Sequence, residues 1–440
     1  MMLKGFAVTN FRGFKDRMEL DLGAVRNYGF NTGCIRDNLI NTALVVGTNA
    51  CGKTNLGLAI FDIVATLTDK GTIMEQKDQG AFLNGDSAEP HATFEYEFQS
   101  DIGTIRYVYS KTAPDSIVYE RLDVGRDNIF LRDGDDSDWT GLKEIGAGNL
   151  RMDVPDGHLA ILRYIANNTV QSEDSPVALV MDFAEHMLYF RSLQENAYIG
   201  IVKGVESLEE YIIRNGMIAD FQRFLKDMAD VDVELGSVRV EGIGDLFVQR
   251  TKNRPIVFNS VSSSGTKSLM LFYYWMRHFK DVRFLFMDEF DAFYHYELAD
   301  KILRRMVELD DVQVILTSHN TTLLKNSSLR PDCCLYMDSG RIASFADRTD
   351  RDIRQGHNLE KMYRGGEFDV RSQGAVHRRR ETGRAPHAYL HAQGTDGDQT
   401  REHLRARRIH TPAAQEDVPR WIDRRGPRCR VRPTRGCVRR

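Results

Sequence analysis

The chain has 440 residues, a formal net charge of −4 and 42% hydrophobic residues, enough for two or three domains with a substantial core. No stretch approaches the ~20 uninterrupted apolar residues of a membrane-spanning helix, and the six cysteines show no metal-ligand spacing. These features exclude a membrane-spanning protein and a disulfide-stapled secreted domain. Together with an N-terminus that lacks an apolar signal region, they predict a cytoplasmic protein.

The first predicted elements, in residues 3–68, are strands, a phosphate loop and a helix. The apolar run 43–46 precedes Gly-Thr-Asn-Ala-Cys-Gly-Lys-Thr at residues 47–54, a G-x-x-x-x-G-K-[ST] motif. Glycines let backbone N–H groups turn toward a polyphosphate at the positive end of the helix. Lys53 can reach the β- and γ-phosphates, and the Thr54 hydroxyl can ligate Mg²⁺. The sequence therefore predicts an ATP site with Mg²⁺. Its predicted contacts in and directly after the loop are Gly47, Asn49, Gly52, Lys53, Thr54 and Asn55.

The middle of the chain changes pattern twice. Residues 91–131 alternate apolar and polar positions, with turn residues between the runs, which predicts an antiparallel meander. From about 157 to 231 the apolar positions recur at helical spacing, which predicts a helical insertion or lid. No sustained heptads occur, so long coiled-coil arms are not expected.

A serine- and glycine-rich stretch at 261–268 precedes an apolar helical pattern. Serine and glycine at the start of a helix present free N–H groups and a hydroxyl, which can form an anion site. One interpretation is an ordinary N-cap. The other is that Ser264 and Gly265 address a phosphate on another subunit, and the spacing does not choose between them.

Two carboxylates end the next buried strand. The run Phe-Leu-Phe-Met at 284–287 is followed by Asp288 and Glu289, and ligand sites lie at the carboxyl ends of such strands. We expect Asp288 to hold Mg²⁺ and Glu289 to polarise the water that attacks the γ-phosphate. The alternative is a solvated pair that only ends the strand.

A histidine follows the last predicted core strand. The apolar run 312–317 leads into His319, and a histidine at the carboxyl end of a strand beside the phosphate loop can contact the γ-phosphate or the attacking water. The alternative is a structural or merely exposed histidine.

The order of these motifs resembles the ABC-type ATPase core, closest to the branch that holds RecF, SMC and the OLD-family ATPases. The opening turn Asn-Phe-Arg-Gly-Phe at 10–14 and Asn55 directly after the phosphate loop support that branch. The stretch 288–295 looks like the bacterial AAA-type ATPases often found in phage-defence operons. The resemblance covers about residues 3–368.

The resemblance implies a mechanism. In this class two cores dimerise head to tail around ATP, so Ser264 and Gly265 would contact the partner's γ-phosphate, and Asp291 would lie in a loop between the two sites. The usual signature Leu-Ser-Gly-Gly-Gln is altered here, which argues against a transporter. Gln76 and Gln79 are both candidates for a Mg²⁺-ligating glutamine of this class, and their surroundings do not choose between them.

The last segment differs in composition. Residues 371–440 hold 18 Arg, no Lys and 7 Asp plus Glu, about +11, which leaves about −15 for residues 1–370. The segment has too little apolar surface to fold alone and is expected to be disordered. It is interpreted as a nucleic-acid-binding arm, a tail without a role, or an out-of-frame translation, with the last slightly favoured; its Asp396 and Asp398 are not taken as a nuclease site.

The predicted fold is an α/β P-loop NTPase with an ABC-ATPase-like core, an antiparallel β subdomain, a helical lid and a tail. The predicted divisions are 1–150, 151–240, 241–370 and 371–440. The predicted function is a Mg²⁺-dependent ATPase switch that forms a homodimer or higher homo-oligomer around ATP and controls a separate effector protein in phage defence or DNA-damage response. The alternative is a scaffold that holds ATP with little or no hydrolysis. Nucleic acid stays open as a partner.

Overall fold

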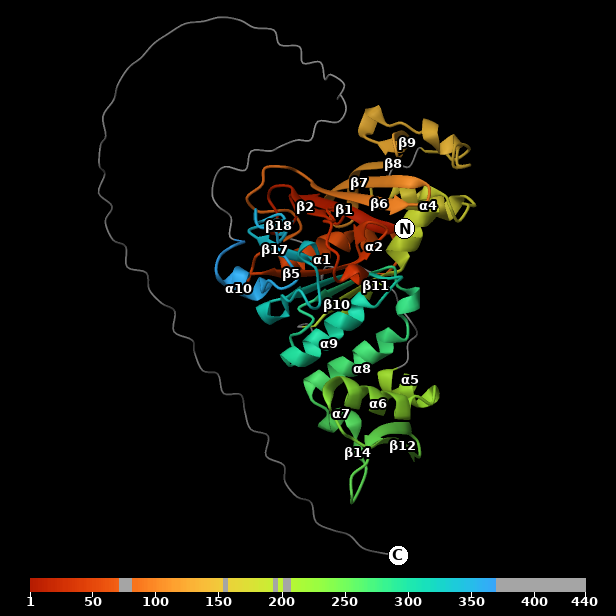
Figure 1. The fold of residues 1–440 in the computed structure, drawn as a ribbon. Helices are drawn as coiled ribbons and strands as arrows, with labels where there is room; N and C mark the ends of the chain where they lie inside the picture. Colours follow the sequence, from red (N-terminus) through yellow and green to blue (C-terminus); the bar gives the residue numbers. More distant parts are fainter. Residues whose placement is uncertain (71–80, 153–156, 193–196, 201–206, 369–440) are drawn as a thin grey trace, which may run out of the picture. The chain divides into compact units, whose positions relative to one another are not determined.

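The computed structural model describes residues 1–70, 81–152, 157–192, 197–200 and 207–368 (Figure 1). Contacts divide the chain into two units, 1–374 and 375–440, and every described residue belongs to the first. The arginine-rich segment and the two glutamines proposed as Mg²⁺ ligands, Gln76 and Gln79, therefore lie outside the described residues. No helix in the described part of the chain is long and apolar enough to cross a membrane.

A seven-stranded sheet carries the phosphate loop. Its five inner strands run parallel, and an antiparallel strand closes each edge. The inner strands are almost wholly buried, as expected for continuous apolar runs in a parallel sheet covered on both faces. In spatial order the strands are β11 (Ala197–Gly200), β10 (Met187–Arg191), β15 (Phe284–Asp288), β16 (Gln313–Ser318), β5 (Thr42–Gly47), β17 (Cys334–Asp338) and β18 (Arg341–Ser344).

The predicted antiparallel meander is present. It forms a six-stranded sheet together with the two opening strands, and alternate side chains of β6 are buried, as the period-two pattern requires. In spatial order the strands are β2 (Met18–Asp21), β1 (Met2–Thr9), β6 (Ala92–Ser100), β7 (Gly103–Ala113), β8 (Ser116–Val124) and β9 (Asp127–Arg132).

The helices after the phosphate loop, α1 (Lys53–Ile60) and α2 (Asp62–Leu67), lie between the two sheets (Figure 1). On one side the Tyr96 hydroxyl of β6 donates to the Ala59 carbonyl, 3.1 Å away. On the other side α1 packs closely on the seven-stranded sheet. A β-carbon at Gly57 would lie 2.7 Å from a ring carbon of Phe286 and 2.8 Å from the Tyr189 hydroxyl. This contact holds α1 against β10 and β15, and β15 is the strand that ends in the carboxylates.

Two strands interrupt the segment that was expected to be helical from 157 to 231. Its helices are α3 (Ile161–Asn168), α4 (Pro176–Glu185), α5 (Leu208–Arg214) and α6 (Ile218–Ala229). Between α4 and α5, however, β10 and β11 join the seven-stranded sheet, so the prediction of an uninterrupted helical segment was wrong there. The aromatic and methionine side chains of β10 are buried, as expected for core residues. The divisions at 150, 240 and 370 stay a prediction.

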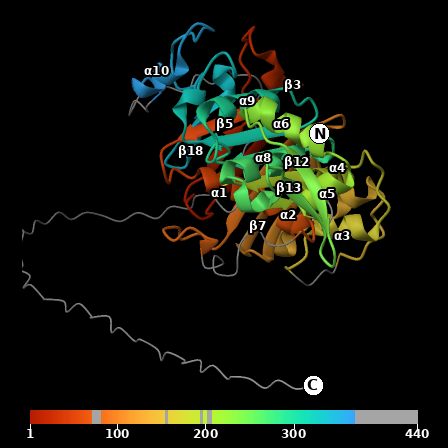
Figure 2. The same cartoon turned by 90° about the horizontal axis from the view of Figure 1, so that it is seen from below.

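The opposite face of the seven-stranded sheet is covered by α8 (Ser264–Met276) and α9 (Tyr296–Val307). Phe190 of β10 meets Trp275 of α8 edge to face, with ring centroids 5.9 Å apart. Figures 1 and 2 both show α5 and α6 beside α8, with a small three-stranded sheet beyond them. The remaining elements are β12 (Leu235–Val240), β13 (Gly244–Gln249), β14 (Ile256–Val257), α7 (Phe258–Val261), α10 (Leu359–Arg364) and the hairpin β3 (Ile35–Arg36) and β4 (Leu39–Ile40).

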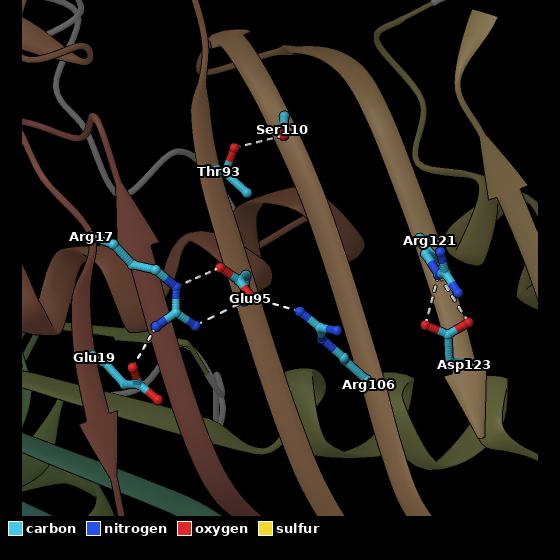
Figure 3. Close-up of polar contacts among 8 residues, drawn as sticks. All are labelled: Arg17, Glu19, Thr93, Glu95, Arg106, Ser110, Arg121 and Asp123. Atoms are coloured by element: carbon cyan, nitrogen blue, oxygen red, sulfur yellow. Dashed lines mark hydrogen bonds and ion pairs between the residues drawn. The ribbon is translucent and has the colours of Figure 1, made fainter. Parts of the chain in front are cut away.

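The outer face of the six-stranded sheet carries ion pairs (Figure 3). Glu95 accepts from Arg17 at 3.0 Å and from Arg106 at 2.8 Å, and Arg121 pairs with Asp123 at 2.7 Å. These three arginines are therefore matched by carboxylates on the same face, and Arg106 and Arg121 also line a hollow of about 640 Å³. Such paired charges do not form a basic groove for nucleic acid.

A buried carboxylate ties this sheet to α3. Glu120 of β8 accepts from the N–H groups of Ile161 and Leu162, at 2.6 and 2.9 Å, and from the Tyr107 hydroxyl at 2.9 Å. Burial raises the pKa of Glu120, although these hydrogen bonds oppose the rise. The side chain therefore satisfies free N–H groups at the start of a helix without reaching solvent.

We expect Glu120→Gln to lower the free energy of unfolding by about 1–3 kcal/mol. The N–H₂ group of the new amide would face one of the buried N–H groups from which the carboxylate now accepts. Since the folded pKa is raised, the stabilising contribution of Glu120 is complete below its unfolded pKa and falls as pH rises toward the folded value. The loss of unfolding free energy in Glu120→Gln, measured by urea titration, should thus be larger near pH 4 than at pH 7. The exposed Glu144→Gln is the control; equal losses in both variants would contradict the expectation.

Candidate functional site

The phosphate loop connects β5 to α1 in the conformation that its sequence requires. Gly52 has φ +114°, and a β-carbon there would lie 2.9 Å from the Phe14 ring, so a side chain would meet both strain and a steric clash. The first turn of α1 begins at Lys53, directly after Gly52. Free N–H groups at this helix start are therefore close to the position of a bound polyphosphate. Asn49 is exposed on the loop.

Lys53 is buried within the loop. Its Nζ donates to the carbonyl oxygens of Gly47 and Thr48 at 3.2 and 3.3 Å, and lies 3.0 Å from Nε2 of His319. The ammonium group is thus held between β5 and the end of β16. A cation in this position can pair with phosphate oxygens as a point charge.

Thr54 and Asp288 bring two oxygen donors together. Thr54 Oγ1 donates to Asp288 Oδ2 at 2.7 Å, and Asp288 is almost wholly buried at the end of β15. Hydroxyl and carboxylate oxygens are hard donors of the kind that Mg²⁺ prefers, and Mg²⁺ in nucleotide sites takes few protein ligands. The described residues contain no cluster of three or more His, Cys, Asp or Glu side chains suited to a metal. The residues present fit Mg²⁺ bound together with a nucleotide.

Glu289 and His319 lie next to each other at the same edge of the sheet. Nε2 of His319 is 3.2 Å from a carboxylate oxygen of Glu289, and both side chains are partly exposed. Glu289 has φ +48°, a left-handed conformation that costs a non-glycine residue free energy and is often found at functional sites. The structure therefore brings together Lys53, Thr54, Asp288, Glu289 and His319, which lie on or next to β5, β15 and β16.

Thr317 was not predicted as a site residue. Its hydroxyl donates to Asp288 Oδ1 at 2.7 Å and accepts from the Glu289 N–H at 2.8 Å, while its carbonyl accepts from the Phe290 N–H at 3.2 Å. One fully buried side chain thus orients both carboxylate residues and holds the strained backbone. No local pattern in the sequence marked this contact, since it depends on the parallel pairing of β16 with β15.

We expect Thr317→Val to lower kcat by about ten- to a hundredfold, because an unpaired N–H and a freed carboxylate would misplace Glu289 and Asp288. The affinity for ATP should change much less. Thr42→Val is a matched control, because Thr42 is a buried threonine on β5 whose hydroxyl lies 3.4 Å from a backbone carbonyl, that of Met306. Steady-state kinetics and nucleotide titration would separate the two parameters; a kcat equal to that of Thr42→Val would contradict the role.

The opening turn lies against the phosphate loop. Asn10 and Arg12 have left-handed backbones, and the turn places Phe14 beside Gly52. A β-carbon at Gly13 would lie 2.8 Å from Nδ2 of Asn55. The turn and Asn55, which carried the resemblance to one branch of ATPases, are therefore in contact in this chain.

Ser264 and Gly265 lie at the start of α8 and not at the phosphate loop. Ser263 caps the helix, with its hydroxyl accepting from the Thr266 N–H at 3.1 Å, so the N-cap interpretation is correct. No hydrogen bond among the described residues joins Ser264 or Gly265 to the loop, and Ser264 is exposed. Gly265 instead lies close to the Phe293 carbonyl, in the segment that follows Asp291.

Asp291 is partly buried in the turn after β15. Burial raises the pKa of its carboxyl, while hydrogen bonds with the side chains of Ser318 and Asn320 and the nearby His319 oppose the rise. The residue expected to communicate between two sites thus contacts residues that flank His319.

Comparisons with known proteins identify the family of this chain. A family model described as "AAA domain, putative AbiEii toxin, Type IV TA system" matches residues 43–325, more than half of the chain. No curated protein matches. Similar solved structures include the SMC head domain from Thermotoga maritima (13% identity, 78% of this chain and 98% of that chain, TM-score 0.37). A second similar structure is an Smc head domain from Pyrococcus furiosus bound to the C-terminal domain of ScpA (13% identity, 82% of this chain and 98% of that chain, TM-score 0.39). A third is an SmcHead bound to the C-winged helix domain of ScpA (13% identity, 78% of this chain and 96% of that chain, TM-score 0.40).

Proposed function

This chain belongs to the AAA_21 family, so the predicted α/β P-loop ATPase fold is confirmed, and we propose that the protein hydrolyses ATP as a molecular switch. One observation carries the proposal: Glu289 and His319 lie beside Lys53 and the Thr54–Asp288 pair. This arrangement joins groups for phosphate binding, metal binding and water activation at one edge of a sheet.

The chemistry follows from the positions of these side chains. The N–H groups after Gly52 and the Lys53 ammonium bind the phosphates, and Thr54 and Asp288 would hold Mg²⁺. When bound, Mg²⁺ neutralises charge on the β- and γ-phosphate oxygens. Glu289 accepts the proton of the attacking water, and His319, 3.2 Å from Glu289, contacts the γ-phosphate or that water.

The same protein would dimerise around ATP. Ser264 is exposed at the start of a 13-residue helix, and neither Ser264 nor Gly265 is used by the described part of its own phosphate loop. These two residues are therefore suited to a phosphate bound by a second copy. Hydrolysis would then release the dimer and change the state of a separate effector. The resemblance to ATPases of phage-defence operons supports phage defence or DNA-damage response as the setting.

The test is ATP turnover by the purified full chain with Mg²⁺ and with EDTA, together with its mass in solution in ATP and in ADP. Mg²⁺-dependent phosphate release and a larger species in ATP are the expected results. Tight ATP binding without turnover or a change in mass would favour the scaffold alternative, and an absence of ATP binding would contradict both.

A further inference from the structure

Arg191 ends β10, the strand beside the one that carries Asp288. The two residues are direct partners in the parallel register, Arg191 to Asp288, as Tyr189 is to Phe286 two residues earlier. Directly paired residues of neighbouring strands point to the same face, about 4.8 Å apart along the hydrogen-bonding direction. Because Tyr189 and Phe286 both contact Gly57 of α1, this is the face that carries the phosphate loop.

The guanidinium of Arg191 has no anionic partner among the residues that the structure describes. Its Nε is buried and lacks a hydrogen-bond partner. The nearest expected partner, Asp288, has both carboxylate oxygens engaged, one by Thr54 and one by Thr317. A buried N–H of a cation without an acceptor is costly, so this group is suited to an anion that the described residues do not supply.

The face of β10 that carries Arg191 also lies close to the start of α1. The Tyr189 hydroxyl lies 3.5 Å from the Thr54 carbonyl at the start of α1. Burial raises the pKa of Tyr189 well above its usual range and the Asp288 carboxylate adds to the rise, whereas the positive charges of Arg191 and Arg12 oppose it. Tyr189, which lies on the same face of β10 as Arg191, is thus next to the start of α1.

We propose that Arg191 is a nucleotide ligand whose guanidinium binds the terminal phosphate of ATP, an inference that rests on the proposed function. Thr54 and Asp288 would hold the Mg²⁺ that accompanies the nucleotide, so a cation one strand away from Asp288 is well placed to bind the terminal phosphate. His319 lies on the other side of β15, after β16. The terminal phosphate would thus be held from both sides, and a planar guanidinium can donate two N–H groups to it.

The experiment compares full-length wild type with Arg191→Gln, Arg191→Lys and the control Arg283→Gln. Arg283 lies at the opposite end of β15 and pairs with Asp182 at 3.2 Å, away from the site. Affinities for ADP and for the β,γ-imido analogue of ATP would be measured by calorimetry with Mg²⁺, and melting temperatures without nucleotide. We expect Arg191→Gln to weaken the ATP analogue by about ten- to a hundredfold, leaving ADP affinity and melting temperature unchanged. Arg191→Lys should restore part of the loss.

Equal affinities of wild type and Arg191→Gln for the ATP analogue would overturn the inference and leave the proposed function intact. Equal losses for ADP and the ATP analogue, or a lowered melting temperature, would also overturn it, since they indicate a contact with another phosphate or a structural role. If wild type binds neither nucleotide, the proposed function fails together with this inference.

Discussion

Glu289→Gln should lower the rate of ATP hydrolysis by about 10²- to 10⁴-fold, because the amide cannot accept the proton of the attacking water. The glutamine has nearly the same shape, so the Glu289 N–H bond to Thr317 and the contact of Thr54 with Asp288 are kept. Affinity for ATP should therefore survive, and the variant should accumulate as the larger ATP-bound species. Phosphate release, nucleotide titration and mass in solution on the same samples would measure all three properties.

The matched control is Glu308→Gln, which removes a carboxylate that pairs with Arg305 on the surface of α9. This variant should hydrolyse ATP like wild type. Turnover by Glu289→Gln at the wild-type rate would show that Glu289 is not the base. If wild type and Glu289→Gln are equally inactive and neither changes mass with ATP, the switch hypothesis is wrong and the scaffold alternative is favoured.

Lys53→Ala should reduce the affinity for ATP by about a hundredfold or more, since it removes a buried cation that can make charge-assisted bonds to phosphate. The hydrogen bonds that Lys53 donates are to the Gly47 and Thr48 carbonyls of its own loop. We therefore expect a modest change in melting temperature without nucleotide and a large loss of the stabilisation that ATP gives to wild type. Calorimetric titration and thermal unfolding with and without ATP would check both parts.

Lys143→Ala is the control for loss of a lysine, because Lys143 is exposed beyond β9 and does not contact the loop. It should bind ATP like wild type. An unchanged ATP affinity of Lys53→Ala would contradict the assignment of residues 47–54 as the nucleotide site. A large loss of stability without nucleotide would instead assign Lys53 a structural role.

Local patterns were sufficient for much of the core. A continuous apolar run before a glycine-rich loop predicts a buried parallel strand followed by a helix, and β5, α1, β15 and β16 have that form. The meander at 91–131 could also be predicted, because half-buried antiparallel strands alternate buried apolar and exposed polar residues. The N-cap at the start of α8 followed from the preference of serine for that position.

The spacing of apolar residues did not predict the strand at 187–191. A short apolar run has the same pattern in a buried strand and in a buried helix turn, and the flanking helices α4 and α5 favoured the second interpretation. Residues 187–191 form a strand because they pair with β15, which lies about a hundred residues further along the chain. For this reason Tyr189 and Arg191 were not recognised as neighbours of the site.

By itself the sequence determined the residue types proposed to bind phosphate and metal, their order, and the strands near which they lie, because those depend on local conformation and spacing. Only the tertiary structure decided which side chains meet. Thr317 joins Asp288 to Glu289, Phe14 closes over Gly52, and Arg191 stands beside Asp288 without a partner among the described residues. These contacts depend on strand order and register, which are set by burial of the whole sheet and leave no local signal in the chain.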